Sequence, residues 1–306
     1  MAITDRGTID ELVADATTAG HQITVRLIRD WTQAGLLDTP RKRPAGRGRG
    51  SSQALYSANQ RQLLLTLLSK RPDNGIASLA RIPVGIWMYW GDEYVPVRQA
   101  RRALLTWIGN PRASQRRARE TAQAIVGQLD NPKATPAARR ELRKVLTDIG
   151  YTGQLDEDRL ERAVFDVFEP DIHLIRRAVG HPDAPMMVDS VIGAMKARLT
   201  AVAELTADRV TDEALYQARH SHLMAYAEYA VKQPAYAGSA PPQYPDMYEP
   251  VTAEKALNDS CVHLLTTIGL EIMYPERAAQ LRVTAGPADV RSVLPTARQA
   301  ILRPTV

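Results

Sequence analysis

The chain has 306 residues, a single cysteine and a formal net charge of +5. This length is enough to bury a large core, and it favours two domains. The lone Cys261 excludes an internal disulfide framework and any cysteine-cluster zinc or iron–sulfur site. No apolar run approaches the length of a membrane span, and the first residues lack a signal-peptide pattern. We therefore expect a reduced, cytoplasmic protein without a membrane partner.

The charge is unevenly distributed along the chain. Residues 1–110 carry 15 Lys and Arg against 9 Asp and Glu, whereas residues 111–306 carry 24 against 25. All of the excess positive charge therefore lies in the N-terminal third. This asymmetry predicts that the N-terminal part faces a polyanion and that the rest of the chain has a different partner.

Two short helices are predicted within the first 35 residues. The segment from Thr8 to Glu11 has the pattern of a capping box, in which a hydroxyl and a carboxylate each satisfy the other residue's backbone amide. Thr24 is a suitable N-cap for a second helix that runs to about Ala34. Gly35 is placed to end that helix, because glycine tolerates the left-handed conformation common at helix C-termini.

The second helix is predicted to have an apolar face and a basic face. Leu27, Ile28 and Trp31 share one face at helical spacing, and Arg26 and Arg29 point away from it. Either arginine is a candidate for reading guanine in the major groove. A short helix that presents two arginines beside a flexible basic loop is suited to holding duplex DNA.

That basic loop is predicted between Pro40 and Tyr56, where the sequence contains no acidic residue. Its cationic residues are Arg41, Lys42, Arg43, Arg47 and Arg49. Glycines and prolines predict an irregular loop, and Gln53–Tyr56 is expected to return as the strand of a small hairpin, which would make the loop a wing. Each side chain that neutralises a phosphate releases counterions, so the loop would strengthen DNA binding. The alternative is a solvated charged surface without a specific contact.

The remainder of the chain is predicted to be helical. Leu63, Leu64, Leu67 and Leu68 form a buried stripe in a helix that begins at Ser57, and an apolar helix over 79–90 and a basic amphipathic helix over 96–108 follow it. Further helices are expected over 113–128, 136–148, 156–168, 170–179, 185–206, 211–231, 252–271 and 287–302. Asn110-Pro111 is a natural stop. The predicted division is a DNA-binding domain over 1–75, connecting helices over 76–110, and an all-helical domain over 111–306.

The N-terminal residues resemble the winged helix-turn-helix of the MerR family of bacterial transcription regulators. The resemblance covers about residues 5–70, and it is carried by the following residues: Arg26-Leu27-Ile28-Arg29, Trp31, Gly35-Leu36-Leu37, and a basic wing that closes on Leu55-Tyr56-Ser57 before a leucine-rich helix. Asp30 and Ala54 depart from the family pattern, which usually has an aromatic residue and an arginine there. The long antiparallel dimerisation helix of typical members is not evident, and residues 111–306 match no effector domain.

The resemblance implies a homodimer that binds inverted repeats, with the arginine helix in the major groove and the wing on the flanking backbone. Trp31 and Tyr56 would be packing or backbone-contacting aromatics. The candidate DNA-binding residues are Thr24, Arg26, Arg29, Arg41, Lys42, Arg43, Arg47, Arg49 and Tyr56. A small-molecule or protein effector would bind residues 111–306.

Other chemistry-bearing patterns have a structural explanation that is favoured. The aromatic run Trp87–Trp90 suits a cation cage but is more often core at helical spacing. His220 and His222 point to different faces of a helix and cannot chelate one ion, and the same holds for Cys261 and His263. A set of side chains that suits an effector pocket is more frequently helix–helix core: Tyr216, His220, Met224, Tyr226 and Tyr229.

The sequence thus predicts a mainly α protein, with an N-terminal winged helix-turn-helix followed by an all-α C-terminal domain. The leading hypothesis is a sequence-specific, nucleoid-associated transcriptional regulator that binds double-stranded DNA as a homodimer. One alternative is an accessory or architectural DNA-binding protein of a phage or plasmid, acting in excision, partition or replication. Another is a protein- or RNA-binding adaptor without a DNA role. No catalytic motif, metal site or cofactor-binding motif is recognised, so no enzyme activity or cofactor is expected.

Overall fold

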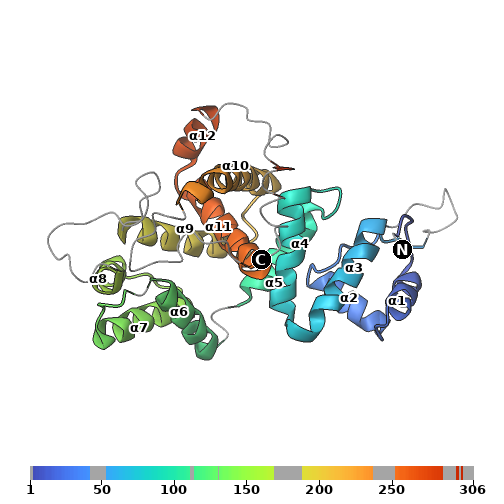
Figure 1. Ribbon diagram of the computed structural model, residues 1–306, viewed down its shortest axis with the longest axis horizontal. Helices are drawn as coiled ribbons and strands as arrows, with labels where there is room; N and C mark the ends of the chain where they lie inside the picture. The colour runs from blue at the N-terminus through green and yellow to red at the C-terminus, as the bar shows by residue number, and fades with distance from the viewer. Residues whose placement is uncertain are drawn as a thin grey trace.

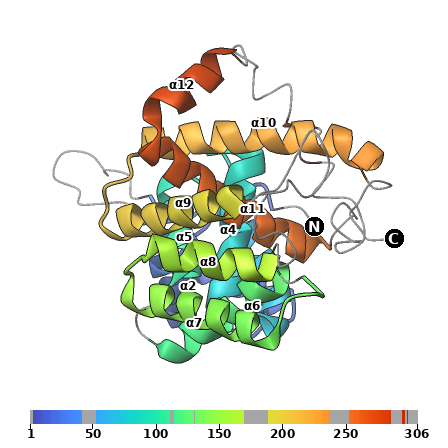
Figure 2. The same cartoon turned by 90° about the vertical axis from the view of Figure 1, so that its left-hand side faces the viewer.

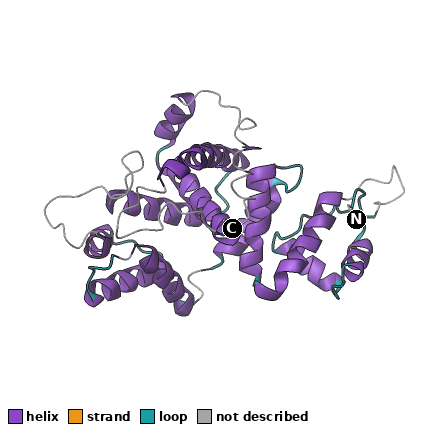
Figure 3. Cartoon of the chain, viewed as in Figure 1, coloured by secondary structure: helices purple, strands orange, loops and turns teal. Residues whose placement is uncertain are grey.

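The computed structural model describes residues 3–41, 53–110, 114–129, 131–168, 188–236 and 252–284, together with 294, 295 and 298. The described part is mainly α-helical, as the sequence predicts, and it contains no β-strand (Figure 3). None of its helices is both long and apolar enough to cross a lipid bilayer.

The helices follow one another along the chain with short connections. They are α1 (Ile9–Thr18), α2 (Val25–Gln33), α3 (Ala58–Lys70), the 3-10 turn η1 (Arg71–Asp73), α4 (Ile76–Trp90), α5 (Val97–Ile108), α6 (Gln115–Leu129), α7 (Pro136–Thr152), α8 (Glu157–Phe168), α9 (Val188–Thr206), α10 (Asp212–Tyr236), α11 (Ala253–Met273) and α12 (Pro275–Thr284). Most begin and end within a few residues of the predicted bounds. The helix predicted over 170–179 lies outside the described residues, as does most of the one predicted over 287–302.

Helix α12 is absent from the sequence-based prediction. It begins at Pro275, only one residue after Tyr274 ends the preceding helix. Proline after an apolar helix is usually taken as a stop, but it is also favoured in the first turn of a helix, where the missing N–H is not needed. Here the same residue lies just beyond one helix and begins the next.

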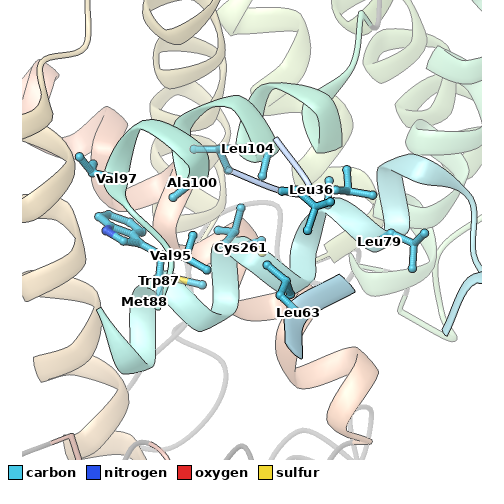
Figure 4. Packing of buried hydrophobic residues seen from close by; sticks show 14 of the residues in the cluster. Leu36, Leu63, Leu79, Trp87, Met88, Val95, Val97, Ala100, Leu104 and Cys261 are labelled. Carbon is cyan, nitrogen blue, oxygen red and sulfur yellow. The ribbon is translucent and has the colours of Figure 1, made fainter. Parts of the chain in front are cut away.

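The molecule is elongated, with two hydrophobic cores along its length. Helices α1–α3 lie at one end, α4 and α5 stand in the middle, and α6–α8 lie at the other end (Figure 1). The first core contains side chains of α1–α5 together with the second half of α9, α10 and α11. Figure 4 shows Leu36, Ala100 and Leu104 gathered in this core with Cys261 of α11. The second core is formed by α6, α7, α8 and the first half of α9.

Helix α9 connects the two cores. Val188 and Met195 are buried in the second core, whereas Ala201 and Leu205 are buried in the first. Figure 2 shows α9 lying between α8 and α10. Residues 111–306 therefore contribute to both cores, and the division into 1–75, 76–110 and 111–306 stays a prediction.

Helix α5 packs directly against the end of α2. Gly35 has φ +76°, which favours glycine, and a Cβ atom added there would lie 2.7 Å from the Cβ of Arg102 and still closer to the backbone of α5. The Thr106 hydroxyl donates a hydrogen bond to the Ala34 carbonyl (2.8 Å). The glycine predicted as a helix stop thus also allows two chain segments to touch.

A buried amide network fixes the same junction from the other side. Gln60 of α3 and Gln99 of α5 are almost completely buried, and the Gln60 amide donates to the Gln99 side-chain oxygen (2.8 Å). Gln60 also accepts from the Asp38 backbone N–H (2.7 Å), and Gln99 donates to the Leu36 carbonyl (3.0 Å). Buried polar groups stabilise a structure only when they are paired, and these pairs specify one arrangement of α3, α5 and residues 36–38.

A second polar network connects α4 with α10 and α11. Ser260 donates to the Ala256 carbonyl (2.8 Å), so its oxygen accepts from the Tyr89 hydroxyl (2.9 Å). Tyr89 then accepts from His222 Nε2 (2.9 Å), and His222 Nδ1 accepts from His263 Nδ1 (2.8 Å). Because each hydroxyl has a single proton, this chain of donors requires both imidazoles to be neutral in defined tautomers, or His263 alone to be protonated.

Gly35→Ala is expected to destabilise the fold by about 3 kcal/mol or more, because it combines the left-handed penalty with a backbone clash. Gly20→Ala is the matched control, since Gly20 also has a positive φ (+84°) but nothing lies within 4 Å of an added Cβ. It is expected to cost about 1 kcal/mol. Urea denaturation followed by circular dichroism measures both losses, and equal losses would contradict the close approach of α5.

Stability is expected to fall as the pH decreases from 7 to 5. Burial, with the nearby His263 and Arg219, lowers the pKa of His222 from 6.5 to about 3. Below pH 6.5 the unfolded chain therefore binds a proton that the folded chain does not, and the free energy of unfolding falls by about 1.4 kcal/mol per pH unit until the folded pKa is reached. The stabilising contribution is complete above pH 6.5.

The pH dependence of Tm in His222→Gln tests this expectation. The variant is expected to lose stability less steeply between pH 7 and 5 than the unsubstituted protein. His21→Gln removes a histidine outside the network and serves as the control, with an unchanged slope. The assignment to His222 is wrong if His222→Gln keeps the full slope.

Candidate nucleic-acid interface

Helices α1 and α2 begin with the caps that the sequence predicts. The Thr8 backbone N–H donates to the Glu11 carboxylate (2.6 Å), and the Glu11 backbone N–H donates to the Thr8 hydroxyl (3.2 Å). The Thr24 hydroxyl accepts from the Leu27 backbone N–H (3.3 Å) at the start of α2. Both predicted N-caps are confirmed, and they determine where each short helix begins.

Helix α2 has the predicted apolar and basic faces. Ile28 and Trp31 are buried in the first core. Arg26 has 90% of its side chain exposed, and Arg29 is also exposed. Arg26 Nε lies 3.8 Å from the Asp30 carboxylate, one turn along the helix. Such a solvent-exposed pair contributes little, so it leaves Arg26 available to another partner.

The basic loop is closed at its base by a single pair of residues. Arg41 and Leu55 exchange two backbone hydrogen bonds (3.1 and 3.2 Å), so the two ends of the loop lie side by side. Arg41 itself is exposed. Lys42, Arg43, Arg47 and Arg49 lie outside the described residues.

The predicted returning strand over 53–56 is wrong for the described residues. Leu55 pairs with Arg41, but the next residue, Tyr56, pairs with Gly7 on the opposite side (3.0 and 2.8 Å). Ser57 already caps α3, because its hydroxyl accepts from the Gln60 backbone N–H (3.2 Å). The extended pairing therefore ends after one bridge on each side, and no ladder forms.

Tyr56 is a packing residue in this structure. Its side chain is buried, and its hydroxyl lies 3.3 Å from the Thr32 hydroxyl of α2. Of the two roles that the resemblance implies for Tyr56, packing is the one that its burial favours. The ring thereby fixes the closed base of the loop against the C-terminal half of α2.

An ion pair connects α1 to α3. Arg61 makes two hydrogen bonds to the Asp15 carboxylate (2.7 and 2.9 Å), and both side chains are largely buried. Arg61 also donates to the Asp5 carbonyl (3.0 Å). Paired hydrogen bonds of this kind define the relative orientation of the two groups. The orientation of α1 beside α2 is therefore determined by α3 as well as by the connection over 19–24.

A hollow of about 530 Å³ lies between α2, the base of the loop and α5. Its polar lining residues are Arg29, Thr32, Gln33, Thr39, Gln53 and Arg102, and its apolar lining includes Pro40 and the ring of Tyr56. None of the described residues that line it is acidic. The hollow thus joins Arg29 and Tyr56, two of the predicted site residues, to a residue from outside the predicted site.

That additional residue is Arg102 of α5. Its Nη2 atom donates to the Thr39 hydroxyl (3.3 Å) and lies 3.5 Å from the Asp38 carboxylate. The same carboxylate is already held by Arg98, which contacts both of its oxygens, one of them at 3.0 Å. One buried carboxylate thus faces two arginines, so one positive charge is left without a matching negative charge beside the hollow.

The contribution of α5 could be found only in part from the sequence. The helix over 96–108 is recognisably basic and amphipathic, and this signal is present in the residues. Nothing in the spacing indicates that Arg102 returns to the end of α2, because that depends on the contact at Gly35. The meeting of His222 with His263 was missed for a similar reason, since the two residues lie on different helices, α10 and α11.

Comparison with known proteins adds no relative. No protein-family model, no curated protein and no solved structure matches the chain.

Proposed function

We propose that the chain binds double-stranded DNA through the exposed face of α2 and the basic loop, as a homodimeric, MerR-like transcriptional regulator. The observation that carries the proposal is the pair of exposed arginines on α2, directly beside the closed base of a loop rich in arginine. Helix insertion into the major groove with phosphate contacts on either side follows from these charges. The winged helix-turn-helix assignment belongs to the same proposal.

Arg26 is the residue that we assign to base reading. It lies in the first turn of α2, and N-terminal residues of a recognition helix are those that contact base edges. It does not line the hollow, and its only recorded partner among the described residues is the distant carboxylate of Asp30. A planar guanidinium can donate two hydrogen bonds to guanine O6 and N7. Thr24, Arg41 and the loop cations would contact the backbone.

In vitro selection of duplex DNA on the purified chain, followed by footprinting, tests the proposed function. A regulator is expected to enrich an inverted repeat with half-sites one or more helical turns apart. An architectural protein would instead bend DNA and prefer phased sites. If no duplex is enriched and no duplex binding survives moderate salt, the chain is an adaptor and the proposal is wrong.

Arg26→Lys is expected to reduce the preference for the selected site over random duplex about tenfold or more, because it keeps the charge but loses the paired hydrogen bonds. Competition binding at constant salt measures this preference. Arg277→Lys is the control, since Arg277 is exposed on α12, which lies far from α2 in Figures 1 and 2. An Arg26→Lys variant that keeps its full preference would show that another residue reads the bases.

Removal of two loop charges is expected to weaken binding to all sequences alike. In the double variant Arg47→Gln, Arg49→Gln, the slope of log K against log salt should become less steep by about two, because about two fewer counterions are released. Titrations of selected and random duplex at several salt concentrations measure the slope. An unchanged slope means that these arginines make no phosphate contact.

A further inference from the structure

We propose that the hollow between α2 and α5 is a phosphate-binding site, with Arg29 and Arg102 as its cationic ligands. The phosphate is one of the DNA backbone, beside the groove that α2 enters, and this identification of its source rests on the proposed function. The proposal assigns a DNA contact to α5, outside the segment over 1–75 in which the sequence places DNA binding.

The first support is an excess of hydrogen-bond donors over acceptors. Arg102 Nε is buried without a hydrogen-bond partner among the described residues. Thr39 uses its oxygen to accept from Arg102, so its hydroxyl proton remains for another acceptor. Arg29 has no recorded hydrogen bond or ion pair within the described part of the chain. A phosphate oxygen is an acceptor that satisfies such groups, and arginine matches it with two parallel hydrogen bonds.

The second support is the charge around the hollow. Among the described residues close to it, Asp38 is the acidic group nearest to Arg102, and it is shared with Arg98. Arg98 makes the shorter contacts to both carboxylate oxygens, so Arg102 is incompletely neutralised. Arg29 adds a further positive charge from the facing helix. Positive charge that is focused in a concave, partly desolvated surface favours an anion.

The third support is that Arg102 is held in place before any ligand arrives. It precedes the point where the α5 backbone meets Gly35, and Thr106, one turn further on, is hydrogen-bonded to Ala34. The helix therefore cannot move away from α2 without breaking this junction. A side chain on a fixed helix loses less freedom on binding than one on a surface loop.

The apolar part of the hollow favours a backbone phosphate over a free one. Pro40, Ala54 and the ring of Tyr56 line the hollow beside its donors. A free phosphate ion has no apolar surface to place against them. A nucleotide unit within a DNA strand does, because the deoxyribose next to each phosphate presents C–H groups.

Arg102→Gln tests the assignment. The variant is expected to bind selected and random duplex about tenfold more weakly, with an unchanged preference between them and a salt slope less steep by about one. Arg102→Lys keeps the charge and should restore the slope but only part of the affinity. Arg101→Gln is the matched control, because Arg101 is the adjacent cation on α5 and contacts Asp212 (2.5 Å) instead of the hollow. It should bind DNA normally.

The outcomes separate this inference from the proposed function. If the chain binds duplex DNA and Arg102→Gln binds equally well, the hollow is not a phosphate site, and DNA binding by α2 stands. If the chain binds no duplex, but inorganic phosphate raises its Tm more than chloride at equal ionic strength and Arg102→Gln abolishes the difference, the site binds free phosphate and the proposed DNA source is wrong. If neither ligand depends on Arg102, the inference is overturned. Circular dichroism of each variant establishes that the fold is retained.

Discussion

At the end of α2 the chain passes α5 at a distance that only glycine permits. The contact at Gly35 places Arg102 beside α2, and the hydrogen bond from Thr106 to Ala34 holds the helices together. The buried amides of Gln60 and Gln99 then bind α3 to the same junction. Because these groups are desolvated, each lost hydrogen bond leaves an unpaired polar atom in the core, so the arrangement resists small displacements. The exposed face of α2 is rigid for this reason.

The same helix α5 faces two partners with two consecutive arginines. Arg102 faces Asp38 and the hollow, whereas Arg101 contacts Asp212 at the start of α10 (2.5 Å) and the Val210 carbonyl. Residues one apart on a helix point to different sides, and this geometry lets α5 hold both neighbours at once. The first core includes side chains of α10 and α11 as well. The N-terminal helices are therefore not an independent body attached by a linker.

Local features of this fold were predictable from the sequence, and the long-range contacts were not. Thr8 and Thr24 are capping residues, and the leucine stripe on α3 is buried, because both depend on spacing within one helix. The single-residue pairing of Tyr56 with Gly7 was not predictable, since it joins segments about 50 residues apart. The His222–His263 contact also joins two helices whose relative rotation no periodicity specifies. For the candidate site, the sequence indicates Arg26 and Arg29, but it does not indicate that Arg102 joins them.

The position of α5 gives the second half of the chain a physical route to the DNA-facing surface. A ligand or partner that moved α10 would pull on Arg101 and on the Tyr89–His222 contact, and both of these act on helices of the N-terminal core. Since Arg101 and Arg102 share one rigid helix, a rotation of α5 that relaxes one contact changes the other. Coupling of this kind requires an element with two arrangements that both sites favour differently. The close packing at Gly35 limits α5 to rotations that preserve this junction, so α5 is the element on which any effect of the C-terminal helices on DNA binding would act.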